Sequence, residues 1–155
     1  MKKGILEVGV FTLILTLLLS TTAFASGARI WMEAQDAALQ AGESTTVIVH
    51  VDTDQPVNAY RFDLSFNPGL INIQGVEAGP DGFMAASAVK AGLLKVNGFE
   101  AEGKGPGADM QFLVLKVNAI SPGKASITLV PRIFVDKDGK AIEVSEVKGI
   151  SLLIQ

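Results

Sequence analysis

Cysteine is absent from this chain of 155 residues, and histidine occurs only once, at His50. The chain can therefore form no disulfide, and no cysteine can carry a lipid anchor. A metal site built from cysteine and histidine is also excluded, because one imidazole without a thiolate supplies too few ligands. We expect His50 to be an ordinary surface or packed residue among valines, and we predict no cofactor and no metal.

Clusters of positive charge are missing as well. The chain has 13 Lys and Arg against 16 Asp and Glu, for a net charge of −3 with histidine neutral. Binding to phosphate backbones requires grouped Lys and Arg, and no such group occurs in the sequence. Nucleic acid is therefore excluded as a partner.

Catalytic constellations are also lacking. The single histidine has no recognisable Ser and Asp partners for a nucleophilic triad, and no phosphate-binding loop is present. Glu100 and Glu102 are close in sequence, but they fall at the end of a predicted strand and no substrate groove is indicated. The segment from Asp136 to Gly139 is similar to the start of a calcium loop, yet its glycine comes fourth instead of sixth, which favours a turn. We expect a protein that is not an enzyme.

The N-terminus has the pattern of a secretory signal. Met1-Lys2-Lys3 is basic, Val8 to Leu19 is mostly apolar, and Ala23 and Ala25 supply the small residues that a signal peptidase reads. We predict a signal peptide over residues 1–25, cleavage after Ala25, and a secreted product without stable membrane insertion. The alternative is an uncleaved anchor, although the apolar run is shorter than the roughly 20 residues that span a bilayer. Residues 26–155 would form a single domain.

The most regular stretch runs from Val57 to Leu70. Its apolar and aromatic residues occupy every second position, as in a strand with one buried face and one solvated face. The expected inward row is Tyr60, Phe62, Leu64 and Phe66, and the expected outward row is Ala59, Arg61, Asp63 and Ser65. Asn67-Pro68-Gly69 then ends the strand, because proline has no amide hydrogen for the ladder and glycine permits the turn.

The rest of the chain also has the pattern of strands separated by turns. Further strands are predicted at 28–34, 45–52, 70–77, 92–100, 110–120, 125–131 and 147–154, with 83–90 either a short strand or a helical turn. Turns or loops are predicted at 78–82, 103–108, 121–123 and 136–139. About nine short strands without a long amphipathic helix predict an all-β fold. We expect a two-sheet antiparallel sandwich with jelly-roll topology.

The order of these pieces resembles a known family. Ala41-Gly42-Glu43 precedes a valine-rich strand, VNAYRFDLSFNPGLINIQGVEAG and GLLKVNGFEAEG follow, and FLVLKVNAISPGKASITL comes before a final strand after Asp138-Gly139. Over essentially all of residues 26–155 this order is similar to the cohesin domains of cellulosomal scaffoldins. The resemblance implies a nine-strand jelly roll that binds dockerin modules, the calcium-loaded helical tags on polysaccharide-degrading enzymes.

The resemblance also implies a binding surface on the outer faces of the strands at 57–66 and 92–100. An asparagine and an aspartate that family members often carry there fall on Ala59 and Arg61, so Asp63 would supply a carboxylate instead. An acidic contact falls on Glu100. The candidate partner-binding residues are Ala59, Arg61, Asp63, Lys95, Asn97, Phe99 and Glu100.

Each of these residues also has a simpler interpretation. Arg61 and Asp63 fit an ordinary solvated strand face. An outward Phe99 would suit an interface anchor, but a register error of one residue would turn it inward.

Two other functions remain open beside a secreted, non-catalytic dockerin-binding module. A carbohydrate-binding module of the same jelly-roll type would bind polysaccharide through a flat row of exposed aromatic side chains. Tyr60 is predicted to point inward, and Trp31 is expected in the core instead of on a sugar ring, so that row is missing. A structural or assembly domain at the cell surface is the other alternative.

Overall fold

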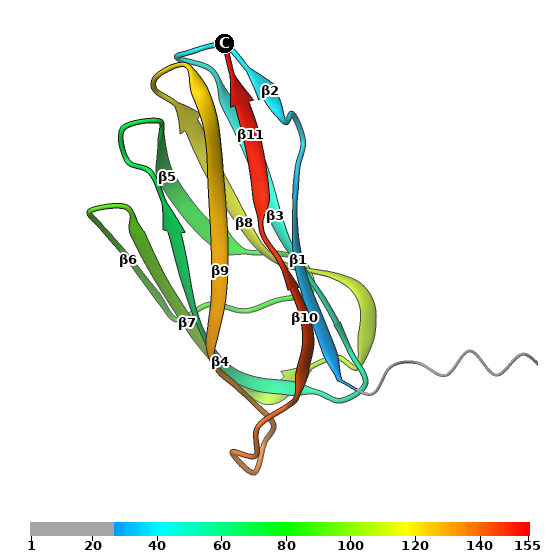
Figure 1. Cartoon of the computed structure of the whole chain (residues 1–155). Coiled ribbons are helices and arrows are strands. Elements are labelled where there is room, and N and C mark those ends of the chain that lie inside the picture. Colours follow the sequence, from blue (N-terminus) through cyan, green and yellow to red (C-terminus); the bar gives the residue numbers. More distant parts are fainter. Residues whose placement is uncertain (1–26) are drawn as a thin grey trace, which may run out of the picture.

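The computed structural model describes residues 27–155, which form a sandwich of two β-sheets (Figure 1). The predicted signal peptide and its cleavage site after Ala25 lie outside the described residues. The strands are β1 (Ala28–Ala34), β2 (Ala38–Leu39), β3 (Ser44–Thr53), β4 (Val57–Phe66), β5 (Ile71–Ala78), β6 (Ala86–Lys90), β7 (Leu93–Lys104), β8 (Gly107–Ala119), β9 (Gly123–Val135), β10 (Val144–Lys148) and β11 (Ile150–Ile154).

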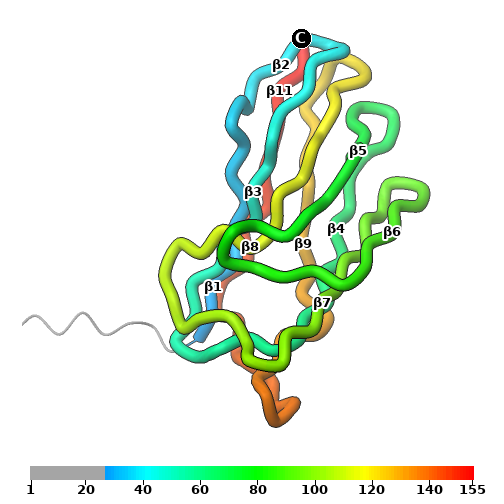
Figure 2. The backbone as a smooth tube through the Cα atoms, turned by 180° about the vertical axis from the view of Figure 1, so that it is seen from behind, coloured from blue at the N-terminus to red at the C-terminus, as the bar shows by residue number. Residues whose placement is uncertain are grey.

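The two sheets are unequal in width. The six-stranded sheet has the order β2-β11-β9-β4-β7-β6 and lies in front in Figure 1. The five-stranded sheet has the order β10-β1-β3-β8-β5 and faces the viewer in Figure 2. Neighbouring strands are antiparallel except for the pairs β1–β10 and β2–β11. The predicted all-β sandwich is confirmed, with eleven strands in place of about nine.

The two extra strands arise where the chain crosses between the sheets. The segment predicted as one strand over 147–154 divides at Gly149 into β10 in one sheet and β11 in the other. A Cβ atom at Gly149 would lie 2.4 Å from the Ile127 carbonyl oxygen, so only glycine fits this crossing. The short β2 makes the same change of sheet after β1, and it pairs with β11. The first two strands, β1 and β2, therefore pair with the last two, β10 and β11, along one side of the sandwich.

An aromatic layer fills the space between the sheets beneath β4. The predicted inward row of β4 is buried, with at most 8% of any of its four side chains exposed. Tyr60 packs edge-on against Phe83 and Phe112, and its hydroxyl donates a 2.7 Å hydrogen bond to the Phe83 carbonyl. Burial raises the pKa of Tyr60. Because β4 is fixed from below in this way, its outward side chains have defined positions.

Two predicted boundaries were wrong or incomplete. The glycine-rich segment 103–108 was expected to be a loop, but β7 continues to Lys104 and β8 begins at Gly107. The Asn58 side chain supports this extension, because its amide donates to the carbonyls of Glu100 and Ala101 on β7. Within 83–90 the strand alternative was correct for β6, whereas Phe83 belongs to the core. Residues 27–155 contain no helix long and apolar enough to cross a membrane.

Candidate functional site

The outward rows of β4 and β7 lie beside each other on the six-stranded sheet. Ala59 is opposite Phe99, Arg61 is opposite Asn97, and Asp63 is opposite Lys95. Residues opposite each other in an antiparallel pair share one face, so these six candidate residues form one continuous surface. The predicted register is therefore correct, and Phe99 points outward.

Glu100, the seventh candidate, does not continue this row. The ladder between β4 and β7 is interrupted after Phe99 and resumes only where Val57 meets Lys104. Glu100 falls within the interruption and has no opposite residue on β4. It is half-buried, whereas Lys95, Asn97 and Phe99 are exposed. The structure thus places Glu100 at the end of the surface and outside its regular part.

Strand β9 adds a third row, which the sequence did not predict. Its register sets Ile133 opposite Arg61 and Val130 opposite Asp63. Between them the pairing shifts by one residue, so that Arg132 is the extra residue of a bulge. Pro131 was a usable signal, because proline within a sheet favours bulges. Ending the predicted strand at residue 131 missed both Arg132 and Ile133. We call the surface made by Ala59, Arg61, Asp63, Lys95, Asn97, Phe99, Val130, Arg132 and Ile133 the β4–β7–β9 face.

Asp63 lies at the centre of this face. Its carboxylate accepts hydrogen bonds from Nε of Arg61 at 3.4 Å and from Nε of Arg132 at 3.0 Å. The side chain is only 10% exposed, so the expectation of a fully solvated outer row was wrong at this position. Burial alone would raise the pKa of Asp63, but the Arg132 hydrogen bond and the nearby Arg61 charge outweigh it and hold the pKa below its ordinary value.

Large apolar side chains surround these charges. Phe99 is 71% exposed, Ile133 is 47% exposed and Val130 is 41% exposed. A single exposed apolar residue is common on soluble proteins, but three on the two strands that flank β4 on one face are typical of an interaction surface. An exposed aromatic residue beside arginines has the composition found at interface anchors.

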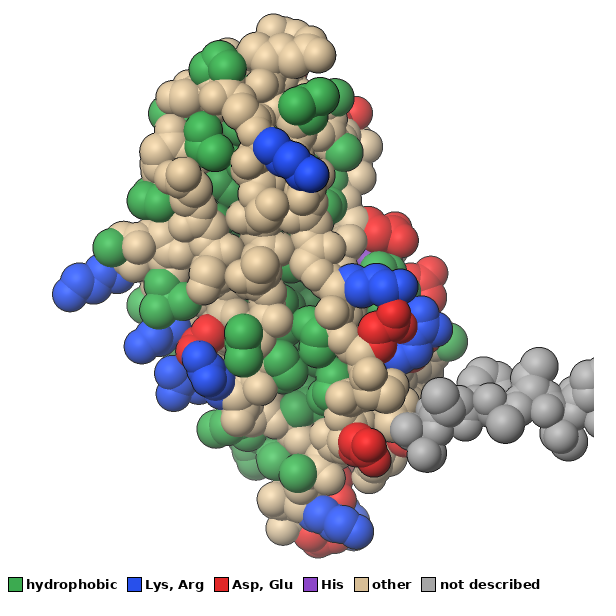
Figure 3. All heavy atoms as spheres, viewed as in Figure 1, with side chains coloured by type: hydrophobic (Ala, Val, Ile, Leu, Met, Phe, Trp, Pro, Cys, Tyr) green, Lys and Arg blue, Asp and Glu red, His purple; other side chains and the backbone are tan. Residues whose placement is uncertain are grey.

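A shallow depression of about 330 Å³ adjoins the charges toward the sheet edge. It is lined by Arg61 from β4, Lys95 and Asn97 from β7, and Ala86, Ser87 and Ala88 from β6. Figure 3 shows the same face in space-filling form, with blue side chains gathered around a red one on the left of the molecule. The lining of the depression therefore combines two cationic side chains with small residues of β6.

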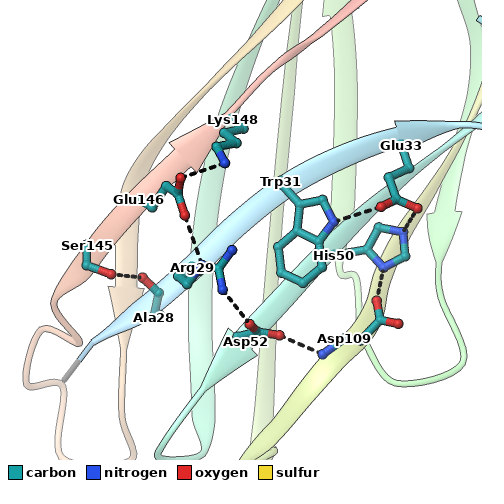
Figure 4. A network of polar contacts seen from close by, with 10 residues as sticks. All are labelled: Ala28, Arg29, Trp31, Glu33, His50, Asp52, Asp109, Ser145, Glu146 and Lys148. Carbon is teal, nitrogen blue, oxygen red and sulfur yellow. Dashed lines mark hydrogen bonds and ion pairs between the residues drawn. The ribbon is translucent and has the colours of Figure 1, made fainter. Parts of the chain in front are cut away.

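The opposite sheet carries a polar cluster in which several charged side chains pair with one another (Figure 4). Glu146 bridges Lys148 and Arg29, Arg29 also pairs with Asp52, and Asp52 accepts a hydrogen bond from the backbone N–H of Asp109. The hydrogen bonds from Lys148 and Arg29 lower the pKa of Glu146. We call this group the Trp31 cluster; its members are Arg29, Trp31, Glu33, His50, Asp52, Asp109, Glu146 and Lys148.

Trp31 was expected in the core, and that was wrong. Ile30 and Met32 take the inward positions of β1, so Trp31 lies on the outer face. Its ring stacks on His50 with 5.1 Å between centroids, and its Nε1 donates to Glu33. Of the two alternatives for His50, a surface or a packed strand residue, the packed one is correct, because only 5% of the residue is exposed.

Two carboxylates lie beside the His50 ring. Asp109 Oδ1 is 2.7 Å from Nδ1, and Glu33 Oε2 is 3.7 Å from Nε2. In the described part of the chain neither ring nitrogen of His50 has a hydrogen-bond partner, so these carboxylates are close neighbours of the ring and are not hydrogen-bonded to it. Within residues 27–155 no three His, Asp or Glu side chains are arranged to hold a metal ion.

A second hollow lies on the outer face of the five-stranded sheet. It measures about 480 Å³ and is lined by parts of β3, β5 and β8. Its charged lining residues are Glu77 and Lys116, one of each sign, and its apolar residues Val76, Val114 and Leu115 are half-buried or buried. This hollow therefore has neither a net charge nor an exposed apolar anchor.

No sequence profile of a known protein family and no curated protein matches this chain. Solved structures do match it. A non-cellulosomal cohesin of the archaeon Archaeoglobus fulgidus is 19% identical and has a TM-score of 0.70, covering 83% of this chain and 91% of its own. The chain has the cohesin fold.

Two further structures agree. The sixth cohesin of Acetivibrio cellulolyticus scaffoldin B, solved in complex with a dockerin, is 16% identical with a TM-score of 0.70, covering 83% of this chain and 99% of its own. A cohesin module of a Clostridium perfringens family 33 glycoside hydrolase is 12% identical with a TM-score of 0.69, covering 84% and 98%. The cohesin jelly roll inferred from the order of sequence motifs is therefore confirmed as a fold.

Proposed function

We propose that this protein is a secreted, non-catalytic binding module that recognises a dockerin-bearing partner through its β4–β7–β9 face. The observation that carries the proposal is the exposure of Phe99, Ile133 and Val130 on one sheet of a cohesin fold. Several similar cohesins were solved in complex with dockerins, which supports a partner of that kind.

Direct binding of polysaccharide has less support. Stacking on sugar rings needs several exposed aromatic side chains in one plane. In residues 27–155 Phe99 alone is an exposed aromatic residue, and Trp31, which is half-buried, is already stacked on His50. The face therefore suits a protein surface better than a glycan chain.

A pull-down tests the proposal. The immobilised protein is incubated with the culture supernatant of the producing organism, and retained proteins are identified by mass spectrometry. We expect a dockerin-bearing protein to be retained by the native chain and lost with the Arg61→Ala/Phe99→Ala double variant. The matched control is Leu153→Ala, which truncates another exposed apolar residue of the same sheet outside the β4–β7–β9 face. Retention of the protein on insoluble cellulose with no dockerin captured would contradict the proposal.

Secretion has its own test. N-terminal sequencing of the protein recovered from the medium should begin at Ser26, as cleavage after Ala25 requires. Recovery only in the membrane fraction with residues 1–25 still attached would favour the anchor instead.

A further inference from the structure

The β4–β7–β9 face and its edge at β6 carry positive charge, although the chain as a whole is negative. The chain has a net charge of −3. On this face, however, Arg61, Arg132 and Lys95 stand against a single carboxylate, that of Asp63. Lys90 extends the positive charge along β6, since it lies opposite Leu93 in the same outward row. A local charge opposite to the overall charge indicates the sign of the partner surface.

Arg61 and Arg132 keep hydrogen-bond donors that do not contact Asp63. Both hydrogen bonds to Asp63 come from Nε atoms. Within residues 27–155 the terminal amino groups of Arg61 and Arg132 donate no side-chain hydrogen bond, and Lys90 and Lys95 form no ion pair. Asp63 thus orients the two guanidinium groups and leaves donors for a second carboxylate, which guanidinium geometry suits well.

The depression beside Arg61 has the size and chemistry to receive such a group. Arg61, Lys95 and Asn97 supply donors to its lining, and the other lining residues, Ala86, Ser87 and Ala88, are small. Its volume of about 330 Å³ exceeds that of one carboxylate side chain, so an acidic side chain of a partner fits within it. Phe99 follows Asn97 in the outward row of β7 and offers an apolar contact beside it.

We propose that this depression receives an acidic side chain from a helix of the partner, next to an apolar side chain that packs on Phe99. The inference rests on the proposed function and makes it more specific. The partner is a dockerin whose binding helices are acidic where they meet β4, β6 and β7. We infer a carboxylate of a protein partner and not a free anion, because a free anion would leave the exposed apolar residues beside the depression without a contact.

Selection from a displayed library tests this inference. The probe is a set of dockerin modules randomised on the exposed surfaces of their helices, sorted against the protein purified from culture medium. The recovered clones are then measured against Lys95→Glu and against Lys116→Glu, a matched control on the outer face of the five-stranded sheet. Lys95 forms no ion pair within residues 27–155 but lies opposite Asp63, so thermal unfolding of Lys95→Glu must first show that the variant is folded.

We expect the selected clones to carry Asp or Glu on the binding helices. Lys95→Glu should weaken the best clone roughly tenfold or more, the scale of one lost interfacial charge pair, and Lys116→Glu should change nothing. Changing the clone's acidic residue to lysine should restore binding to Lys95→Glu. Clones without acidic residues, or equal affinity for Lys95→Glu, would overturn the charge inference and leave dockerin binding standing. Recovery of no clone at all would overturn the proposed function and this inference with it.

Discussion

The two sheets of this sandwich present opposite kinds of surface to solvent. On the five-stranded sheet the charges of the Trp31 cluster from Lys148 to Asp52 pair with one another, and Trp31 stacks on His50. On the six-stranded sheet Phe99 is exposed and Lys95 has no ion-pair partner within residues 27–155. A surface whose charges pair with one another stabilises the fold, whereas a surface with unused donors and exposed apolar groups is suited to binding.

The comparison predicts that equal substitutions have unequal effects on stability. Phe62→Ala should lower the free energy of unfolding by about 3–5 kcal/mol, because Phe62 is fully buried and its truncation leaves a cavity. Phe99→Ala should change it by less than about 0.5 kcal/mol, since Phe99 lies on the exposed face. Urea unfolding of both variants measures the difference, and similar losses would show that Phe99 is part of the core.

Dockerin affinity should depend on Phe99, although the stability of the fold does not. Phe99→Ala should weaken a selected dockerin by about 2 kcal/mol, or roughly thirtyfold in Kd, as expected for an interface anchor. Leu153→Ala removes a side chain that is 50% exposed on β11 of the same sheet and should leave Kd unchanged. Titration calorimetry gives both values. Equal affinities for the two variants would show that Phe99 does not contribute to dockerin binding.

Trp31→Ala should show the pattern expected for the opposite face. Removing this ring uncovers His50 and deletes a stacked pair, which should cost about 1–2 kcal/mol of stability. Dockerin affinity should be unchanged, because the Trp31 cluster lies on the other sheet. Thermal unfolding and the same calorimetric titration provide the check. A loss of dockerin affinity without a loss of stability would show that the face carrying Trp31 binds the dockerin.

The loss of stability at low pH should differ between the two faces by a smaller amount. Asp63 and Glu146 both have a pKa below the ordinary value in the folded state. Each therefore stabilises the fold above the unfolded pKa of about 4, and that stability is lost as the pH falls through the lower folded value. Asp63→Asn should flatten the decline in stability below pH 4 more than Glu146→Gln, since the Asp63 side chain is 10% exposed and that of Glu146 is 38% exposed. Urea unfolding at pH 5 and at lower pH tests this order, and a larger effect of Glu146→Gln would contradict it.

Much of the fold was predictable because strands repeat with a period of two. The alternation from Tyr60 to Phe66 correctly predicted which side chains are buried, and the same parity placed Phe99 outward. Trp31 could have been assigned in the same way, since Ala28, Ile30 and Met32 occupy the alternate buried positions of β1. The error came from weighing its apolar character above its position in the strand.

The centre of the candidate site was less predictable, because it depends on which strands become neighbours. Asp63 is buried by Arg132, which lies 69 residues away and reaches it only because β9 pairs with β4 and bulges there. The alternation within a strand carries no information about its neighbour in the sheet. The depression beside Arg61 likewise needs β6 at the edge of β7, and that segment alone fitted either a strand or a helical turn.

The most direct test of the central claim is an NMR titration of the isotopically labelled protein with a selected dockerin. The amide signals of Arg61, Lys95, Phe99 and Ile133 should shift, because their strands form the β4–β7–β9 face. Those of Trp31, His50 and Lys116 on the five-stranded sheet should stay in place. Shifts concentrated on β1, β3 and β8 would contradict the account and assign binding to the other sheet.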